Sequence, residues 1–182
     1  MRIRLRKLEP ADLPFLYRWE NDASVWADSD THNPLSKQDL RDYIESTTGD
    51  IYRDGQLRLV IEQVAPSSEA DLPLSECTTG DLAVVQTIGC IDLFDFDPRN
   101  RKAAMGLYIA PEARHHGAGY EAVKQMEQYA FACLNLRLLY VVIREQNTAC
   151  IALYRRLGYQ EIAHLPQWTL EGNAIVLAKY SL

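Results

Sequence analysis

The segment that most constrains the fold of this chain is a short apolar strand followed by a glycine-containing helix start. The strand ends at Ile109, Pro111 prevents its continuation, and the pattern Arg-x-x-Gly-x-Gly over residues 114–119 opens a long amphipathic helix. Glycines allow a tight turn with exposed backbone N–H groups, and a helix start adds unpaired N–H groups and the positive end of its dipole. The pattern therefore predicts a diphosphate site, with an ordinary helix start as the alternative.

The same residues also fit a dinucleotide-binding fingerprint. Residues 117–122 match G-x-G-x-x-A, and Glu145 lies at the end of the next apparent strand. Seven residues, 110–116, separate the strand from the first glycine, whereas in that fingerprint the glycine follows its strand almost directly. A second set of alternating strands and helices is also missing from the pattern. A nucleotide-binding regulatory domain is therefore the more distant alternative.

The downstream sequence supplies a second motif. A helix over residues 118–134 is followed by the apolar run 138–143 and then by Asn147, Tyr154 and the pair Gly158-Tyr159. In this order and spacing the two motifs resemble the GNAT superfamily of acyl-CoA-dependent N-acyltransferases. The resemblance is strong over residues 87–160, fair over 1–60 and poor over 65–85. It implies acetyl-CoA as co-substrate, no metal, and direct acetyl transfer to a primary amine in a ternary complex.

The resemblance also implies which residues contact the coenzyme. The loop would bind the pyrophosphate, and the pantetheine arm would pair with the fourth strand as an added β-strand. Asn147 would contact the pantetheine, although asparagine is also a good helix N-cap. The three strand residues can equally be plain core, because the backbone binds while alternate side chains pack. The expected cofactor-binding residues are Leu107, Tyr108, Ile109, Arg114, His115, His116, Gly117, Ala118, Gly119, Tyr120 and Asn147.

Tyr154 is the expected general acid. It matches the family tyrosine that protonates the coenzyme A thiolate, and it lies two helical turns after Asn147. An ordinary phenol, with a pKa of ~10, is protonated at neutral pH. The alternative is a core tyrosine, because Cys150 and Leu157 also line that helix.

The general base is not where the resemblance places it. Many relatives carry a glutamate near the start of the fourth strand, and here Ala104 stands at that position. Asp92 in the neighbouring strand is the candidate carried forward as a catalytic residue. Asp95 and Asp97 are further candidates, but turn chemistry is the favoured reading of both.

The region expected to recognise the acceptor lies near the N-terminus. Residues 19–30 contain two tryptophans among four carboxylates, a composition that suits an amine cation through charge and cation–π contact. Trp26 and Asp28 are the expected substrate-binding residues. The region resembles those of polyamine and ribosomal-protein N-terminal acetyltransferases. A solvated loop with inward-packing tryptophans is the alternative.

Charge and cysteine usage restrict the class of protein. The formal net charge of −6 disfavours nucleic acid as a partner, since phosphate binding needs clustered Lys and Arg. No apolar run approaches the ~20 residues that span a bilayer, so no membrane association is expected. The four cysteines have neither C-x-x-C nor zinc-like spacing, which favours free thiols in a reducing cytoplasm.

The full pattern predicts an α/β protein with a single GNAT domain over residues 1–182. We expect a mixed, twisted sheet of six to seven strands with helices on both faces, and a loop or hairpin insertion over residues 65–85. The expected strands cover residues 2–8, 56–64, 87–94, 102–109, 138–143, 160–165 and 173–180. The predicted function is an N-acetyltransferase acting on a polyamine, a protein N-terminus or another small amine, and a homodimer is included as an expectation. The rival is a non-catalytic acyl-CoA-binding sensor or interaction module of the same fold.

Overall fold

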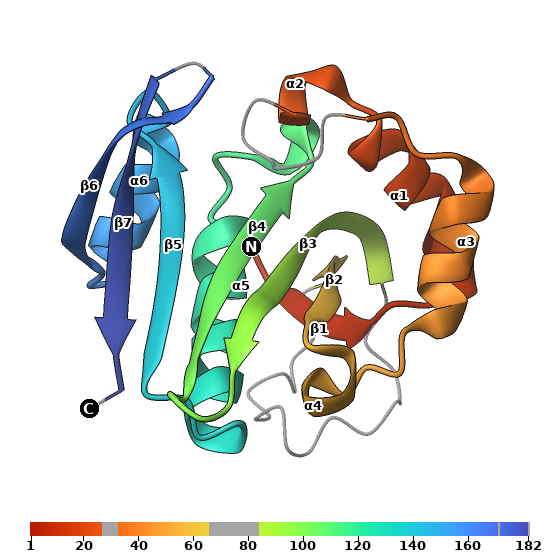
Figure 1. Cartoon of the computed structure of the whole chain (residues 1–182). Coiled ribbons are helices and arrows are strands. Elements are labelled where there is room, and N and C mark those ends of the chain that lie inside the picture. The colour runs from red at the N-terminus through yellow and green to blue at the C-terminus, as the bar shows by residue number, and fades with distance from the viewer. Residues whose placement is uncertain (27–32, 66–83, 171, 182) are drawn as a thin grey trace.

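A seven-stranded mixed sheet forms the centre of the molecule. The computed structural model describes residues 1–26, 33–65, 84–170 and 172–181. The strand order is β1-β2-β3-β4-β5-β7-β6 (Figure 1). Among the described residues only the β4–β5 pair is parallel, so the predicted mixed sheet is confirmed. The strands are β1 (Ile3–Lys7), β2 (Leu57–Val64), β3 (Val84–Asp97), β4 (Lys102–Ile109), β5 (Leu138–Arg144), β6 (Gln160–Thr169) and β7 (Gly172–Tyr180).

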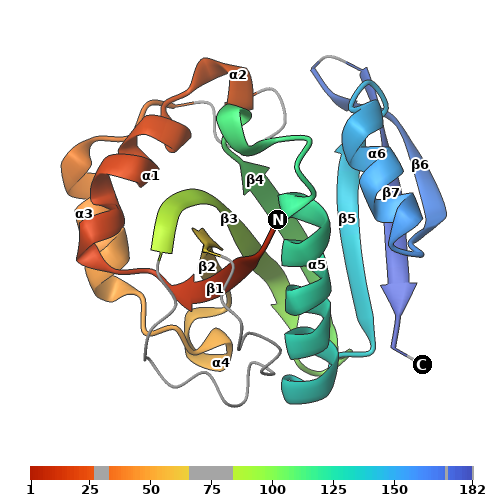
Figure 2. The same ribbon diagram turned by 180° about the vertical axis from the view of Figure 1, so that it is seen from behind.

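Two helical layers cover the sheet. On one face lie α1 (Leu13–Glu20), entered through the 3-10 turn η1 (Pro10–Asp12), and α3 (Lys37–Ser46), with the short α2 (Ala23–Trp26) after α1. On the other face lie α5 (Ala118–Gln128), which continues into the π-helical turn η4 (Tyr129–Cys133), and α6 (Thr148–Arg156). Viewed from behind, α5 and α6 both lie in front of the strands (Figure 2). Two further short elements are α4 (Ile51–Asp54) and η3 (Pro111–Ala113).

Each layer has its own apolar cluster. The larger one lies between the sheet and α5 and α6, and includes Ile91, Met105 and Leu139 from three neighbouring strands. The smaller one lies under α1 and α3 and includes Leu16, Trp19 and Leu40. Because strand side chains alternate, β4 supplies Met105 to the larger cluster and Tyr108 to the edge of the smaller one. A glycine is needed at position 89 of β3, since a Cβ there would collide with the carbonyl oxygen of Tyr108 on β4.

The element bounds differ from the prediction mainly at the ends. Strand 102–109 has the predicted bounds, whereas β3 begins at Val84 instead of residue 87 and β6 runs to Thr169 instead of residue 165. The helix predicted to residue 134 changes to π-helical geometry after Gln128, and α4 was not predicted. The predicted insertion lies, for residues 66–83, outside the described residues. In the part of the chain that the structure describes, no helix has both the length and the apolar content to cross a membrane.

Candidate active site

Strands β4 and β5 part in the middle of the sheet. In the described structure they pair at three positions, of which the last is Ala104 with Tyr140. Beyond it β4 pairs only with β3, and β5 only with β7. Figure 1 shows the two strands diverging from this point. Two facing strand edges with unpaired backbone groups can accept an extended arm, and Leu107, Tyr108 and Ile109 lie on the β4 edge.

The helix start after β4 is open to an anion. Gly117 is the N-cap of α5 with φ +85°, and no side chain caps the helix. The first bond inside the helix runs from Glu121 N to Gly117 O, 3.2 Å. The N–H groups of Ala118, Gly119 and Tyr120 thus have no acceptor among the described residues. A Cβ on Gly117 would meet no described atom within 4 Å, so the space in front of this turn is free.

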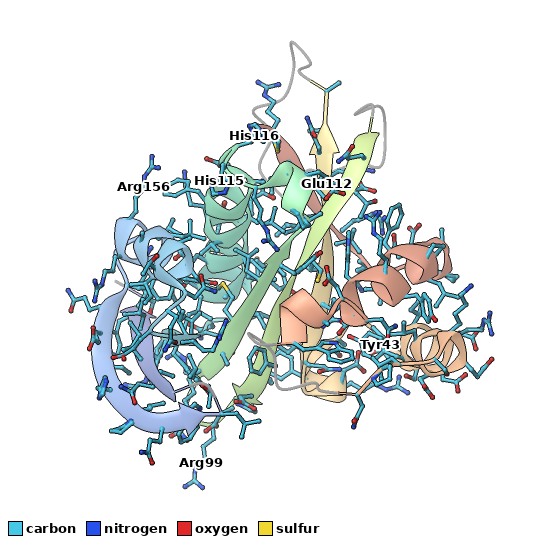
Figure 3. All side chains as sticks on the ribbon, turned by 90° about the horizontal axis from the view of Figure 1, so that it is seen from above. Tyr43, Arg99, Glu112, His115, His116 and Arg156 are labelled. Atoms are coloured by element: carbon cyan, nitrogen blue, oxygen red, sulfur yellow. The ribbon has the colours of Figure 1, made fainter. Side chains whose placement is uncertain are left out.

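Arginine and histidine side chains surround this helix start. Arg114, His115 and His116 are exposed, and Arg114 Nε donates to Ile109 O at 2.9 Å, which leaves its two Nη groups as the outer donors. Arg156 from α6 lies over the Tyr120 ring, with Cζ 4.9 Å from the ring centroid. Figure 3 places His115, His116 and Arg156 on the α5 and α6 side of the strands. The predicted loop residues therefore come together with one arginine that the prediction omitted.

Gly119 joins three elements of this region. A Cβ on Gly119 would lie 3.3 Å from Leu107 on β4 and 3.4 Å from Leu153 on α6. These distances are tighter than ordinary van der Waals contact. Gly119 therefore allows α5, α6 and the unpaired half of β4 to approach one another, and its missing side chain points into packing and not toward the anion position.

Asn147 and Tyr154 both lie on α6, but in different surroundings. Asn147 is the N-cap, and its Oδ1 accepts from Cys150 N at 3.1 Å, which confirms the predicted cap. Tyr154 is only 1% exposed and belongs to the larger apolar cluster, with its ring packed edge-on against Tyr159 at 5.0 Å. Burial raises the pKa of Tyr154 well above its ordinary value, and the nearby Cys150 and Glu127 add to the effect. The phenol is therefore held in its protonated form.

Asp92 lies on the opposite face of the sheet, in an ion-pair cluster. It pairs with Gly106 across β3 and β4, and a Cβ built on Gly106 would lie 3.6 Å from Asp92 Oδ2. Arg58 binds Asp92 through two hydrogen bonds, Nε to Oδ1 at 2.8 Å and Nη2 to Oδ2 at 3.0 Å. Arg58 Nη1 also donates to Glu20 Oε1 at 2.5 Å. Burial is the largest single influence and lowers the pKa of Arg58, but the charge of Asp92, the nearby Cys90, the hydrogen bonding to Asp92 and the charge of Glu20 together outweigh it. The pKa is therefore raised and the guanidinium stays charged.

The other positions considered for a base are occupied differently. Ala104 is buried at the last β4–β5 pair and brings no acid there. Asp97 accepts from the main-chain N–H of Asn100 at 2.8 Å, a turn contact. Asp95 accepts from the Tyr140 hydroxyl at 3.3 Å. Of the three aspartates, only Asp92 lies over the unpaired half of β4.

The expected acceptor region is partly described. Trp26 Nε1 donates to Glu20 O at 2.8 Å, so α2 is tied to the end of α1. Trp19 is buried and stacks on Tyr108 with ring centroids 5.2 Å apart. Asp28 lies outside the described residues. A hollow of about 200 Å³ at the end of α1 is lined by Arg18, Trp19, Asp22, Tyr108, Pro111 and Glu112.

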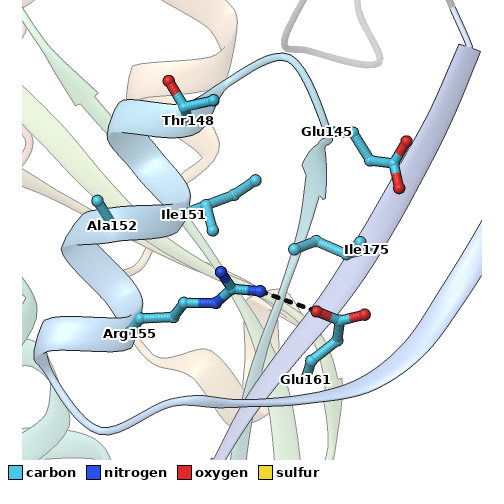
Figure 4. A pocket seen from close by; sticks show the side chains of 7 residues that line it. All are labelled: Glu145, Thr148, Ile151, Ala152, Arg155, Glu161 and Ile175. Carbon is cyan, nitrogen blue, oxygen red and sulfur yellow. Dashed lines mark hydrogen bonds and ion pairs between the residues drawn. The ribbon is translucent and has the colours of Figure 1, made fainter.

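A larger hollow of about 480 Å³ lies on the far side of α6 (Figure 4). Its lining residues come from the turn after β5 and from α6, β6 and β7, and they include the ion pair of Arg155 with Glu161 at 3.0 Å. Glu145 at its rim accepts from Asn173 and contacts His164. None of its lining residues comes from β4, the loop after it or α5, so it is separate from the predicted cofactor site.

Sequence reasoning missed Arg58, which lies in an apparently ordinary strand, and it included Glu20 only as one of the four carboxylates of the expected acceptor region. Their partners are distant in the chain, so no local pattern could reveal the cluster. In the described ranges, no group of three or more His, Cys, Asp or Glu side chains is arranged to hold a metal ion.

Comparison with known proteins identifies the family. Residues 2–160 match the model of the acetyltransferase (GNAT) domain. A spermidine N(1)-acetyltransferase of Escherichia coli strain K12 is 27% identical over 160 residues, which cover 86% of this chain and 72% of the relative.

Solved structures share the fold. The crystal structure of a spermidine N-acetyltransferase from Vibrio cholerae in complex with CoA and spermine has a TM-score of 0.78 at 20% identity, with 98% of this chain and 95% of that chain covered. A dodecameric structure of a spermidine N-acetyltransferase from Vibrio cholerae has a TM-score of 0.73 at 22% identity, with 98% and 93% covered.

Proposed function

Because the chain belongs to the GNAT acetyltransferase family, we propose that it moves the acetyl group of acetyl-CoA to a primary amine of a polyamine such as spermidine. The observation that carries this proposal is the end of the β4–β5 ladder at Ala104 and Tyr140, with the open start of α5 beyond it. A strand-like arm and a diphosphate need these two features next to each other.

The residues present fit coenzyme A. The unpaired edge of β4 offers backbone groups to the pantetheine amides, and the free N–H groups at the start of α5 suit the diphosphate. Arg114 and the exposed His115 and His116 add donors on the same side. Asn147 retains its Nδ2 group as a donor while its Oδ1 caps α6. These contacts support the cofactor-binding roles predicted for the loop, the strand and Asn147.

A cationic acceptor is supported by charge on the opposite face of the sheet. The half-buried Asp92 and Glu20 lie there, with Trp19 and Tyr108 as aromatic neighbours. The hollow at the end of α1 adds the carboxylates of Asp22 and Glu112. Carboxylates and aromatic faces both attract an ammonium. The relatives named as spermidine acetyltransferases agree with a polyamine, and a protein N-terminus is the less supported acceptor.

The reaction joins the amine nitrogen to the thioester carbon and breaks the carbon–sulfur bond. In our proposal Asp92 receives the acceptor ammonium and takes up its proton, directly or through water, so that the neutral amine can attack. Tyr154 donates its phenolic proton to the departing sulfur. The two groups lie on opposite faces of the sheet, so the reacting atoms would meet between them, where β4 and β5 part.

One observation favours a rival. Ala104 replaces the acid expected on β4, and Asp92 is already paired with Arg58. A protein that binds acyl-CoA without turnover would have no need of a base. This non-catalytic sensor is therefore the second candidate.

Turnover of acetyl-CoA with an amine panel tests the proposal. The purified protein is incubated with acetyl-CoA and spermidine, spermine or an N-terminal peptide, and acetylated product is followed by mass spectrometry, because the exposed Cys133 would react with thiol reagents. Acetylated spermidine is the expected product. Stabilisation by coenzyme A without turnover of any amine would establish the sensor instead, and stabilisation by NAD would contradict both.

Two further parts of the proposal concern assembly and location. We propose that the protein forms a homodimer or a larger homo-oligomer, and the dodecamer described for a relative supports this. Light scattering during gel filtration tests it. We also propose a single domain over residues 1–182, and a reducing cytoplasm as its location agrees with Cys90 and Cys133, neither of which forms a disulfide.

A further inference from the structure

Two clusters in this molecule join one arginine to one aspartate and one glutamate. In the first, Arg58 holds Asp92 through two bonds and Glu20 through one. In the second, Arg6 holds Asp12 through two bonds of 2.7 Å and Glu62 through one of 2.6 Å. The two arginine side chains have the same exposure, 21%. The two clusters therefore match in residue types and in the exposure of the arginine, so their remaining differences can be compared directly.

The carboxylates of the two clusters differ in exposure. Asp12 and Glu62 are 3% and 6% exposed, whereas Asp92 and Glu20 are 22% and 23% exposed. A buried carboxylate with its partners in place has only a structural role. A carboxylate that keeps a fifth of its surface can accept a further donor, since its two oxygens have about four lone-pair positions.

The clusters also differ in net charge. Arg4 adds a second cation to Glu62, so Arg4, Arg6, Asp12 and Glu62 sum to zero. Arg58, Asp92 and Glu20 sum to −1. A negative charge in a half-buried place is less screened by salt than one on the open surface, so it attracts a cation more strongly.

The position of the first cluster relates it to the reaction. Asp92 lies over Gly106, in the half of β4 that has left β5. Glu20 ends α1, and its carbonyl oxygen holds Trp26 of α2. Arg58 stacks on Tyr43 of α3, with Cζ 5.6 Å from the ring centroid. The Arg58 guanidinium therefore contacts β3, α1 and α3, and α2 is attached through the Glu20 carbonyl.

We propose that Arg58 is a positioning residue for the acceptor: it fixes Asp92 over Gly106 and, through Glu20, sets the α1–α2 junction relative to that carboxylate, so that the single net negative charge of the cluster binds the acceptor ammonium. This rests on the proposed amine acetyltransferase function. Asp92 touches the amine, whereas Arg58 acts through Asp92 and Glu20.

The charge and the geometry predict different kinetic changes. Asp92→Asn removes the charge that meets the ammonium, so KM for spermidine should rise about 10–100-fold, the range of a charged hydrogen bond. Its kcat should fall as well, because the same carboxylate is the proposed base. Arg58→Met leaves the cluster at −2, so KM for spermidine should not rise. The carboxylate is then no longer fixed, and kcat should fall about 10–100-fold, as expected when a contacting group is misplaced. Arg58→Lys should recover part of kcat, because it keeps the cation but loses the two-pronged geometry.

The experiment measures kcat and KM for spermidine and for acetyl-CoA in these three variants, with Arg6→Met and Arg6→Lys as matched controls. The Arg6 variants should lower the melting temperature and leave both KM values within about twofold. If Arg58→Met loses its fold, Arg58→Lys and Asp92→Asn still carry the test. A wild-type KM for spermidine in Asp92→Asn, or Arg58 variants that change only the melting temperature, would overturn the inference.

Failure of the inference can be told from failure of the proposed function. If the wild type acetylates spermidine but the Asp92 and Arg58 variants match it, the cluster has no acceptor role and the function stands. Calorimetry of spermidine with the coenzyme A complex gives an independent readout, in which Asp92→Asn should bind about 10–100-fold more weakly than wild type. A wild type that neither binds nor acetylates any amine removes the proposed function itself.

Discussion

The two faces of the sheet differ in chemistry at the point where β4 and β5 part. On the α5 and α6 face, Tyr154 lies at 1% exposure among apolar side chains. On the α1 and α3 face, Asp92, Glu20 and Arg58 form a charged cluster, each about a fifth exposed. A proton donor is kept protonated by a dry, apolar environment, whereas recognition of a cation requires charge that a ligand can reach. A single sheet of strands lies between the apolar environment of Tyr154 and the charged cluster.

The largest effect is expected when the hydroxyl of Tyr154 is removed from the apolar face of the sheet. Tyr154→Phe should lower kcat by about 10²–10⁴-fold, the range of a positioned general acid, while KM for acetyl-CoA changes little. The ring is retained, so the free energy of unfolding should change little unless the hydroxyl has a buried partner. Steady-state kinetics and thermal unfolding measure both quantities.

Tyr159→Phe is the matched control for that change. Tyr159 packs edge-on against Tyr154 in the same cluster, and its pKa is also raised by burial. It should keep kcat near the wild-type value. Wild-type kcat in Tyr154→Phe, or equal losses in the two variants, would show that Tyr154 serves packing alone.

A second test separates packing from anion binding at the start of α5. Gly119→Val should cost about 1–3 kcal/mol of unfolding free energy, since its side chain would press on Leu107 and Leu153. Gly117→Ala adds a methyl group in free space and costs only the left-handed backbone, about 1–2 kcal/mol. Chemical unfolding measures the loss of unfolding free energy in each variant, and calorimetric titration measures its affinity for coenzyme A. An unchanged unfolding free energy in Gly119→Val would contradict the close packing of Gly119 against Leu107 and Leu153.

Local patterns predicted what depends on neighbours in the chain. The bounds of β4 and the Asn147 cap both follow from adjacent residues, and both are found. The predicted mixed sheet is found as well, and the strand–helix–strand order explains why β4 and β5 are its parallel pair.

Distant contacts could not be predicted in this way. Arg58 lies 34 residues from Asp92 and 38 from Glu20, and an arginine in an alternating strand looks like any solvated side chain. The sequence pattern around Gly119 is the same whether the absent side chain would point toward a bound phosphate or toward Leu107 and Leu153. Only the packing of α5 against β4 and α6 shows that it would point toward these two residues. The helical turn α4 depends on the left-handed Gly55, a signal too short to distinguish from a loop.

A third test uses pH to probe the charged face. Burial, followed by the charge of Asp92, raises the pKa of Cys90 to about 12 from an ordinary value near 9. Because the folded pKa is the higher one, the stabilisation is fully present below pH ~9 and is lost as pH rises toward 12. The free energy of unfolding should fall in this window by at most about 1.4 kcal/mol per pH unit from this thiol.

Cys90→Ala isolates that contribution. Urea unfolding at pH 8 and pH 10 should show a smaller fall between the two values in the variant than in the wild type. At pH 8 iodoacetamide should label the exposed Cys133 before Cys90. Rapid labelling of Cys90 in the folded protein, or equal pH dependence in the two proteins, would mean that the face beside Asp92 is more open than the structure indicates.

The smallest effect is expected at the N-terminal cap of α3, the helix that contacts the charged cluster through Tyr43. Ser36 caps α3: its Oγ accepts from Asp39 N at 3.1 Å, and Asp39 accepts from Ser36 N at 2.8 Å. Helix α3 carries Tyr43, which stacks on Arg58. Ser36→Ala should cost about 1 kcal/mol of unfolding free energy. The Ser36 hydroxyl and backbone lower the pKa of Asp39. The stability that this pair contributes is therefore present above the ordinary carboxyl pKa and is lost as the pH falls through the folded pKa. Ser36→Ala should lose less stability than the wild type on acidification.

Ser46→Ala, at the other end of α3, is the control. It should cost less unfolding free energy, because the Ser46 hydroxyl only donates to the carbonyl of Tyr43. Both variants should keep KM for spermidine within about twofold of wild type, since the cap does not touch the cluster. A rise in that KM in Ser36→Ala alone would show that α3 positions Arg58 through Tyr43.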